Sequence, residues 1–205
     1  AVFIVDEITS GLRYGFPGAL SKIGVEPDVV VYAKAMSNGF PFAAIVGREK
    51  IMNDGETGFI SSSYWTDGVG PAAALAVLEK MERLNVQEVV WNKGVKFKKA
   101  VHDLALRYPA CKLQVGGMPS TPTIAFQLDE LAAVAKNVYV KKMLEHGFLV
   151  SSIFYLMHAH EDQHIEQLLY AMQNVLAAIE QMIVGGKLSH EPAVTTRNNG
   201  FTRLA

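Results

Sequence analysis

Two ionisable residues end apolar stretches near the start of the sequence. Asp6 follows residues 1–5 (AVFIV), and Lys34 follows residues 28–33 (DVVVYA). A charge at the end of a buried strand is paired, hydrated or used, because uncompensated burial is costly. A lysine amine forms a Schiff base with an aldehyde, and an aspartate beside a pyridine nitrogen keeps that ring protonated and electron-withdrawing. The pair therefore indicates pyridoxal-phosphate chemistry, and a structural ion pair is the alternative interpretation.

Both residues can act together only if their strands share a sheet edge. Residues 1–5 and 28–33 are apolar and β-branched, which is typical of strands buried on both faces of a parallel sheet. A third strand is expected over residues 42–47. Ligands of open α/β sheets bind beyond the carboxyl ends of the strands, so Asp6 and Lys34 are expected to face one crevice.

The elements that follow change character at Pro109. Before it, a polar loop over residues 53–71 leads into a helix opened by Pro71, and a second helix is expected from Val86 to about Tyr108 with Gly94 as a weak point. After it, we expect short strands, helices and one more strand, which is typical of a small α+β domain. Those elements are strands at 113–117 and 123–129, a helix over Leu131–His146, a strand at 148–156 and a helix over Asp162–Val184.

Composition excludes several classes of protein. The 205 residues carry 19 Lys and Arg against 20 Asp and Glu, a net charge of -1, so nothing favours nucleic acid or an anionic membrane as a partner. No apolar run approaches the roughly 20 residues of a membrane helix. The single cysteine, Cys111, cannot form an intrachain disulfide, which favours a reducing, cytoplasmic location.

The residues around Asp6 and Lys34 carry a family resemblance. Residues 5–13 (VDEITSGLR) and 27–47 (PDVVVYAKAMSNGFPFAAIVG) resemble the core signature of class III aminotransferases, which are pyridoxal-phosphate enzymes of fold type I. The DE-x-x-S/T-G-x-R form and the ending at 199–205 (NGFTRLA) are most similar to the glutamate-1-semialdehyde aminomutase-like branch.

The resemblance implies a role for three residues of the first segments. Asp6 corresponds to the partner of the pyridine nitrogen, and Lys34 corresponds to the lysine that carries the cofactor as a Schiff base. Ile8 is expected to pack against one face of the ring. Arg13 is left outside the catalytic set because its position fits a structural ion pair, and Glu7 is interpreted as structural because it lies on the opposite face of the strand from Asp6.

A fourth site residue comes from the polar loop. Residues 65–71 (WTDGVGP) resemble the family's Gly-Thr-x-x-Gly-Asn-Pro loop, which implies that Thr66 reaches the cofactor phosphate of a neighbouring subunit. A hydroxyl and loop N–H groups before a helix suit a dianion. Gly70 stands where the family has Asn, and the hydroxyls of residues 61–63 compete with Thr66, Ser63 among them.

Three histidines near the end of the sequence have metal-like spacing. His158, His160 and His164 flank the start of the last expected helix. The family commonly has Ala-His followed by acidic residues at this junction, so the resemblance assigns His160 to it and no metal is expected. His158 and His164 have no assigned role.

The resemblance also implies the organisation of the chain. Residues 1–108 correspond to the C-terminal part of the large domain, a mostly parallel sheet flanked by helices, together with the connecting helix. Residues 109–205 correspond to the small α+β C-terminal domain. Family members are about twice as long, so we expect this chain to be the C-terminal half of a longer enzyme.

The sequence therefore predicts an α/β protein that binds pyridoxal 5'-phosphate and moves an amino group, as an aminotransferase or an aminomutase. Its substrates are a small-molecule amino donor and carbonyl acceptor, and the implied assembly is a homodimer with composite sites. The alternative is a non-catalytic remnant that acts as an interaction module. An α/β oxidoreductase is disfavoured because no GxGxxG follows a strand. The sequence leaves the substrate open.

Overall fold

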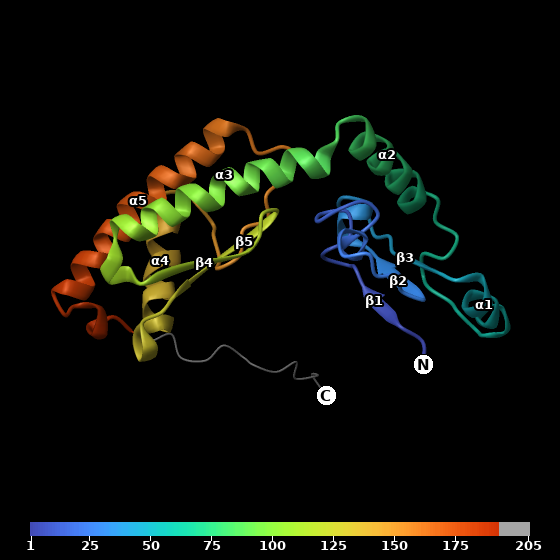
Figure 1. Ribbon diagram of the computed structural model, residues 1–205, viewed down its shortest axis with the longest axis horizontal. Helices are drawn as coiled ribbons and strands as arrows, with labels where there is room; N and C mark the ends of the chain where they lie inside the picture. The colour runs from blue at the N-terminus through green and yellow to red at the C-terminus, as the bar shows by residue number, and fades with distance from the viewer. Residues whose placement is uncertain (193–205) are drawn as a thin grey trace. The chain divides into compact units, whose positions relative to one another are not determined.

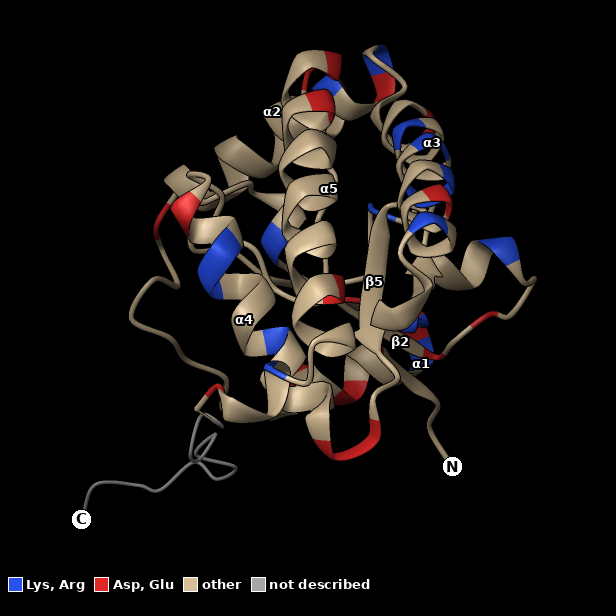
Figure 2. Ribbon diagram, turned by 90° about the vertical axis from the view of Figure 1, so that its left-hand side faces the viewer, with Lys and Arg blue, Asp and Glu red and all other residues tan. Residues whose placement is uncertain are grey.

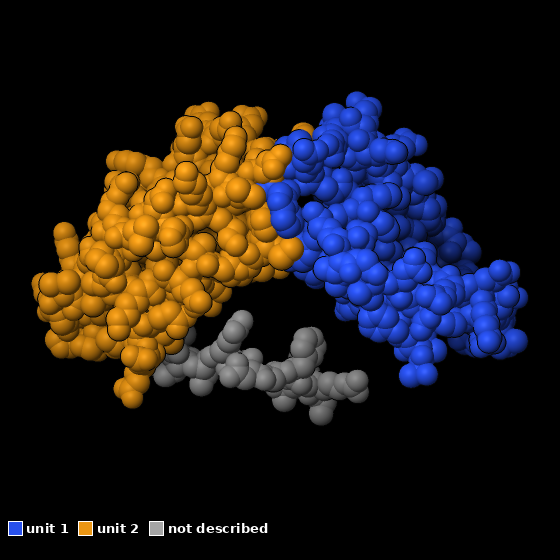
Figure 3. All heavy atoms as spheres, in the orientation of Figure 1, with its two compact units in different colours: residues 1–91 blue, residues 92–205 orange. Residues whose placement is uncertain are grey.

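The computed structural model describes residues 1–192. They fall into two compact units, the first being Ala1–Trp91 and the second beginning at Asn92 (Figure 3). The boundary between the units lies within helix α3 (Val86–Arg107). The division expected at residue 108 lies at the other end of the same helix. The ending at 199–205, which contributed to the resemblance, lies outside the described residues.

The first unit is built on a three-stranded sheet in the order β1 (Ile4–Asp6), β2 (Val29–Tyr32), β3 (Ala44–Gly47) (Figure 1). β1 is parallel to β2, whereas β2 is antiparallel to β3. The sheet is therefore mixed, not mostly parallel as expected. The reason lies in the connection from β2 to β3, which holds only a short 3-10 helix and lacks the crossover helix that a parallel return normally needs.

Residues 2–4, at and before the start of β1, are more exposed than their apolar sequence predicts. Val2 and Phe3 are 52% and 48% exposed, and Ile4 is 60% exposed. Within residues 1–192, β1 pairs with β2 alone, so its other edge has no strand against it.

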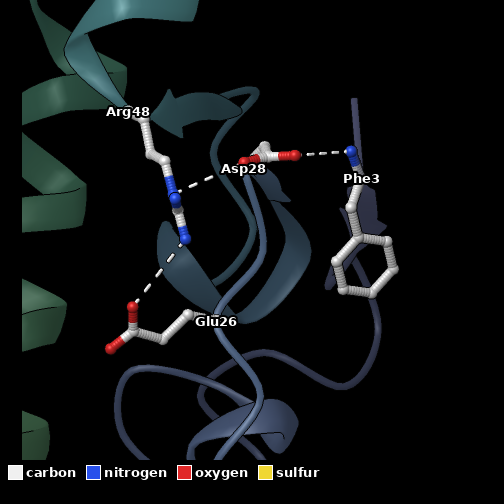
Figure 4. A network of polar contacts seen from close by, with 4 residues as sticks. All are labelled: Phe3, Glu26, Asp28 and Arg48. Carbon is white, nitrogen blue, oxygen red and sulfur yellow. Dashed lines mark hydrogen bonds and ion pairs between the residues drawn. The ribbon is translucent and has the colours of Figure 1, made fainter. Parts of the chain in front are cut away.

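Asp28 fixes the start of β2 against both neighbouring strands (Figure 4). Its Oδ2 accepts a hydrogen bond from Phe3 N at 2.8 Å, and its Oδ1 lies 3.4 Å from Arg48 Nε. Arg48 also donates its backbone N–H to Asp28 O at 2.9 Å and lies 3.9 Å from Glu26. One aspartate thus joins the residues before β1 to those after β3 and stabilises the register of all three strands.

The connections of the first unit are short and irregular. The excursion over residues 10–27 contains only a 3-10 helix, Ala19–Lys22, as its glycines and prolines predict. After β3 come α1 (Glu49–Met52), a 3-10 helix at Asn53–Thr57 and α2 (Val69–Arg83). Pro71 lies in the first turn of α2, where a missing N–H costs no helical hydrogen bond.

The second unit combines a hairpin with three long helices. β4 (Leu113–Met118) pairs antiparallel with β5 (Thr121–Phe126). The helices are α3, α4 (Ala132–Glu145) and α5 (Asp162–Val184), with 3-10 turns at Pro109–Cys111, Asp129–Leu131 and Leu188–His190. The bounds of α5 are those that its periodicity predicts. Figure 2 shows charges of both signs along α3.

The strand expected over residues 148–156 is wrong as a continuous strand. The segment forms one isolated bridge, between Ile153 and Thr123, flanked by bonds from Ile124 N to Ser152 O and from Phe154 N to Pro122 O. Ser151 accounts for the interruption, because its hydroxyl bonds the backbone of Ile153 and competes with a regular ladder.

The core of the second unit forms where the helices cover β5. Phe97 and Val101 of α3 are buried, and so are Tyr139, Met143 and several residues on one face of α5. The buried residues of α5 are Ala171, Met172, Val175, Leu176 and Ile179. Met172 is therefore a core residue, as the 3.6-residue period predicts.

Gly94 has a packing role that its sequence context does not reveal. A Cβ at this position would lie 1.7 Å from Pro119 O, at the turn between β4 and β5. The residue expected to weaken α3 is the one that lets the turn approach the helix. Among the described helices, none combines the length and the apolar character that crossing a bilayer requires.

Candidate active site

Asp6 is the last residue of β1 and lies opposite Val31 in the parallel register. The residue is exposed, and its Oδ1 accepts a hydrogen bond from the backbone N–H of Ile8 at 2.9 Å. This short-range bond orients the carboxylate, and no other hydrogen bond to it is found within residues 1–192. One carboxylate oxygen is therefore available to a ligand.

Lys34 follows the end of β2 and begins the 3-10 helix Lys34–Met36. Its backbone φ of 50° lies in the left-handed region, which residues other than glycine rarely adopt. Its Nζ donates a hydrogen bond to Thr9 Oγ1 at 2.5 Å. Because β1 and β2 are parallel, Lys34 and Asp6 lie at the same edge of the sheet, as expected.

Thr9 is the residue of this edge that sequence reasoning missed. Its hydroxyl joins the loop after β1 to the lysine after β2. The sequence feature that could have indicated Thr9 is its position: it lies three residues after Asp6, in the polar turn that follows β1 near the ends of both strands. Ile8 is half-buried between Asp6 and Thr9, and its packing against a ring stays a prediction.

Glu7 holds the loop that follows β1. The residue is 2% exposed, its Oε1 accepts a hydrogen bond from Leu20 N at 3.2 Å, and the Ser10 hydroxyl donates to Oε2. Burial and the nearby Glu7 charge raise the pKa of Tyr32 above its usual range. A Cβ on Gly11 would lie 2.6 Å from Glu7 O, so only glycine fits this turn.

A pocket of about 340 Å³ lies beside Glu7 and not beside the candidate pair. Its lining includes Glu7, Val30 and Tyr32, but none of Asp6, Ile8, Lys34 or Thr66. The candidate pair lies instead on an exposed edge of the sheet.

Thr66 lies in an exposed turn before α2. Within the described part of the chain, no hydrogen bond joins Thr66 to Asp6, Lys34 or Thr9. The neighbouring Asp67 accepts a hydrogen bond through Oδ1 from Val69 N, the first N–H of α2, at 3.0 Å. Gly70 is buried, and a Cβ there would lie 3.1 Å from both Phe42 Cβ and Pro41 O, so the backbone of the loop packs closely against residues 41–42 at this point. The relation of Thr66, or of Ser63, to a phosphate stays a prediction.

The histidines of the second unit bond the backbone at the start of α5. His160 Nδ1 accepts a hydrogen bond from Met157 N at 3.2 Å, and His164 Nδ1 accepts one from Glu161 N at 3.1 Å. Lys93 Nζ donates to the backbone oxygens of His158 and His160, at 3.0 and 2.5 Å. Burial, then the nearby His164 and Lys93, lower the pKa of His160. No group of three or more metal-ligating side chains is present in residues 1–192.

The chain is similar to known proteins over most of its length. Residues 1–176 match the family model described as Aminotransferase class-III. The 3-aminobutyryl-CoA aminotransferase of Cloacimonas acidaminovorans (strain Evry) is 30% identical over 187 residues, which cover 89% of this chain and 45% of that protein. The glutamate-1-semialdehyde 2,1-aminomutase of Clostridium beijerinckii is 33% identical over 193 residues, covering 84% and 44%. The chain thus spans about half the length of the curated relatives it matches.

Solved structures share the fold. The FumI protein of Sphingopyxis sp. MTA144, solved in its PLP internal aldimine form, superposes with a TM-score of 0.84 at 22% identity, over 90% of this chain and 44% of that one. An S-selective transaminase from Arthrobacter sp. gives 0.78 at 19% identity, over 92% and 46%. The α/β fold of this chain is therefore that of about half an aminotransferase chain.

Proposed function

This chain belongs to the class III aminotransferase family, and we propose from this premise that the complete protein is a pyridoxal-phosphate enzyme that moves an amino group. One observation carries the proposal: Asp6 and Lys34 lie at the carboxyl ends of two adjacent parallel strands. The proposal includes the finer architecture, with residues 1–108 in a fold type I large domain and 109–205 in a small C-terminal domain.

The residues at this edge fit the cofactor in chemical type. Pyridoxal phosphate, when bound, supplies an aldehyde that condenses with amines and a ring that withdraws electrons from the bonds of the amine-bearing carbon. Asp6 would hold the protonated ring nitrogen, and Lys34 would hold the aldehyde carbon. Ile8 would pack against one ring face, and Thr66 would donate to the phosphate in a second subunit.

Asp6 contributes a fixed negative charge. Its Oδ1 is held by Ile8 N–H, which leaves the second oxygen to accept a hydrogen bond from a ring N–H. A carboxylate at hydrogen-bond distance stabilises the charged form of such a nitrogen. The carboxylate would therefore hold a bound ring in its protonated, electron-withdrawing form.

Lys34 contributes an amine that binds and transfers protons. Its Nζ is held at the strand edge by Thr9 Oγ1, so the amine is positioned before any ligand arrives. Once a substrate amine has displaced it from the aldehyde carbon, a lysine in this position could remove the proton from the α-carbon of the substrate and deliver it to another carbon of the bound molecule. This proton transfer would be the contribution of Lys34; transfer of the amino group also requires water to cleave the bond between the nitrogen and the donor carbon, and a carbonyl acceptor to receive the nitrogen.

The substrates and assembly follow from the family. We propose a small-molecule amino donor and carbonyl acceptor, a cytoplasmic location and a homodimer in which Thr66 serves the partner's site. The finer candidate is an aminomutase, which moves the amino group within one substrate. The DE-x-x-S/T-G-x-R form at residues 6–13 supports it, and the matched relatives include both aminotransferases and aminomutases.

An absorbance experiment tests the cofactor role of Lys34. The complete protein is incubated with pyridoxal phosphate, and spectra between about 300 and 500 nm are recorded before and after borohydride reduction. We expect a band that reduction fixes to the protein, that Lys34→Ala abolishes, and that Lys50→Ala, a change at an exposed lysine of α1, leaves intact. Absence of the band from the complete protein refutes the proposal and favours a non-catalytic interaction module.

A further inference from the structure

The turn after Lys34 contains an Asn–Gly pair, Asn38–Gly39, that the proposed activity does not use. Both residues are exposed, and both have a positive φ, of 47° at Asn38 and 110° at Gly39. A Cβ at Gly39 would have no atom within 4 Å, so open space surrounds this residue. Solvent therefore reaches the pair from outside the sheet.

Hydrogen bonds hold the turn on both sides of this pair. Asn38 N donates to Lys34 O at 3.0 Å, and Phe40 N donates to Ser37 O at 3.3 Å. The Ser37 side chain is 1% exposed, and its hydroxyl donates to Phe40 O at 2.6 Å. Ser37 and Phe40 are therefore joined twice, and Asn38 and Gly39 form the short span between them.

The peptide group between Asn38 and Gly39 makes no hydrogen bond to the described residues. Neither Asn38 O nor Gly39 N has a partner within residues 1–192, and the side-chain amide of Asn38 has none there either. Rotation of this peptide group therefore breaks no hydrogen bond of its own. Glycine widens the rotation, because it has no Cβ to restrict φ. Gly39 N can thus approach Cγ of Asn38.

We propose that Asn38–Gly39 is a site of spontaneous deamidation. Gly39 N attacks Asn38 Cγ and gives up its proton, the bond between Cγ and Nδ2 breaks, and Nδ2 leaves as ammonia. Water then opens the cyclic imide at either carbonyl carbon, so residue 38 becomes aspartate or isoaspartate. The two steps are a substitution and a hydrolysis, with water as the co-reactant and no change of oxidation state.

Asn85 is the matched control within the same chain. It is also exposed, and its φ of 46° is similar, in the turn between α2 and α3. Its side-chain amide, however, donates a hydrogen bond to Glu88, and the residue after it is Val86, which begins α3. An engaged amide and a β-branched neighbour with restricted rotation both oppose cyclisation. The two asparagines therefore differ in the features that the proposal requires.

Isoaspartate at residue 38 would change the turn that carries Lys34. The isomer adds one backbone carbon between residues 38 and 39, which the two bonds between Ser37 and Phe40 span. We expect the longer linkage to break at least one of these bonds and to loosen the turn. A consequence for Lys34 rests on the proposed function, whereas the modification itself does not.

The experiment measures deamidation in the folded 205-residue chain. The chain is incubated without denaturant in water enriched in oxygen-18, digested with trypsin in ordinary water and mapped by mass spectrometry. Trypsin cleaves after Lys34 and Arg48, so Asn38 is read in the peptide 35–48. The other Asn–Gly pair of the sequence, Asn199–Gly200, lies outside the described residues and in a different peptide.

We expect the peptide 35–48 to exchange its amide for a carboxylate that carries the oxygen label at Asn38. The rate should be at least about tenfold higher than at Asn85 in the same sample, which requires only a modest difference in activation free energy. It should also rise with pH, because the attacking group is the deprotonated nitrogen of Gly39.

Asn38→Gln tests the chemistry directly. Its amide carbon lies one carbon further from the backbone, which disfavours cyclisation through Gly39 N, so we expect the label to vanish from the peptide 35–48. Asn85→Gln, at the control position, should leave labelling at Asn38 unchanged. No labelling at Asn38, equal rates at Asn38 and Asn85, or labelling that appears only in denaturant would overturn the proposal.

The complete protein tests the consequence for Lys34. Borohydride trapping of pyridoxal phosphate on Lys34 should fall as isoaspartate accumulates in the wild type, and it should stay constant in Asn38→Gln over the same incubation. Full trapping in an aged wild type that contains isoaspartate would overturn the link between the turn and Lys34. A freshly purified protein that traps no cofactor would instead contradict the proposed function.

Discussion

Asp6 and Glu7 are adjacent carboxylates with opposite surroundings. Asp6 is exposed at the end of β1 and has one oxygen held by Ile8 N–H, whereas Glu7 is buried and accepts hydrogen bonds from Leu20 N and the Ser10 hydroxyl. Alternation along an extended strand places neighbouring side chains on opposite faces. One carboxylate is thus available for chemistry and the other for holding the loop.

Substitution at the two positions should separate these roles. Asp6→Asn retains an acceptor for Ile8 N–H, so we expect the free energy of unfolding to change by less than about 0.5 kcal/mol. Glu7→Ala leaves Leu20 N–H and the Ser10 hydroxyl without their acceptor, and we expect a loss of about 1–3 kcal/mol. Urea denaturation of both variants measures the difference. Equal destabilisation would contradict the assignment.

Asp6→Asn should also weaken cofactor binding. In the complete protein, Asp6→Asn removes the charge proposed to hold the protonated ring nitrogen, and we expect the affinity for pyridoxal phosphate to fall although the fold is retained. Spectroscopic titration of the protein with the cofactor measures this affinity. An unchanged affinity in a folded Asp6→Asn variant would show that Asp6 is not the partner of the ring.

Thr9→Val should loosen Lys34 without unfolding the protein. The substitution keeps the shape of the side chain and removes the acceptor of the Lys34 Nζ hydrogen bond. Since such a bond contributes about 0.5–1.5 kcal/mol, we expect the trapping of pyridoxal phosphate on Lys34 by borohydride to slow by about two- to tenfold. Mass spectrometry of the modified peptide gives the rate. Thr9→Ser is the control that retains the hydroxyl, and equal rates in the two variants would remove Thr9 from the site.

The apolar periodicity of the sequence predicts the elements that bury a regular face. β2, the position of Asp6 and Lys34 at one edge of the sheet, and the bounds of α5 agree with the prediction, because their apolar pattern is visible in the local sequence. The first strand is present but shifted, at Ile4–Asp6 instead of residues 1–5. The same pattern overestimates the burial of residues 2–4, because the strand that would cover an edge is not a property of local sequence.

Features that depend on how separate segments come together could not be predicted. The direction of β3 depends on its pairing with β2, and the isolated bridge at Ile153 depends on Thr123 in β5. The Thr9–Lys34 bond joins residues 25 positions apart. Each of these requires the strands to be placed first.

Gly94→Ala should destabilise the protein, although alanine favours a helix more than glycine does. Alanine in a helix is normally more favourable than glycine by about 1 kcal/mol. At Gly94 the new Cβ would lie 1.7 Å from Pro119 O, so the turn between β4 and β5 must move, and we expect Gly94→Ala to cost about 1–3 kcal/mol or more. Gly55→Ala is the control, since no atom lies within 4 Å of a Cβ there. Denaturation followed by circular dichroism should show a loss for the first variant and none for the second.

His160 makes the second unit sensitive to acid. Burial, His164 and Lys93 lower its pKa in the folded state, while the unfolded value is about 6.5. Between the two pKa values the unfolded chain binds a proton that the folded chain resists, so the stability from neutral His160 is present above about pH 6.5 and is lost as the pH falls. Protonation of Nδ1 would also remove the acceptor of Met157 N–H.

A pair of histidine variants tests this pH dependence. We expect the wild-type protein to lose more unfolding free energy between about pH 7.5 and 5.5 than His160→Gln, which cannot titrate. His102→Gln, at an exposed histidine of α3, should behave like the wild type. Parallel pH profiles for the wild type and His160→Gln would show that another group is responsible.

Tyr139→Phe should not destabilise the protein, although it changes a residue that is 1% exposed. The hydroxyl has no hydrogen-bond partner among residues 1–192, so removing it eliminates an unsatisfied buried group whose cost is about 1–3 kcal/mol. The ring and its contact with Phe126 remain. We therefore expect unfolding free energy to stay equal or to rise by about 1 kcal/mol, whereas Tyr139→Ala, which removes the ring, should cost about 3–5 kcal/mol. A marked loss of stability in Tyr139→Phe, measured by urea denaturation, would show that the hydroxyl is satisfied in solution, for example by a bound water.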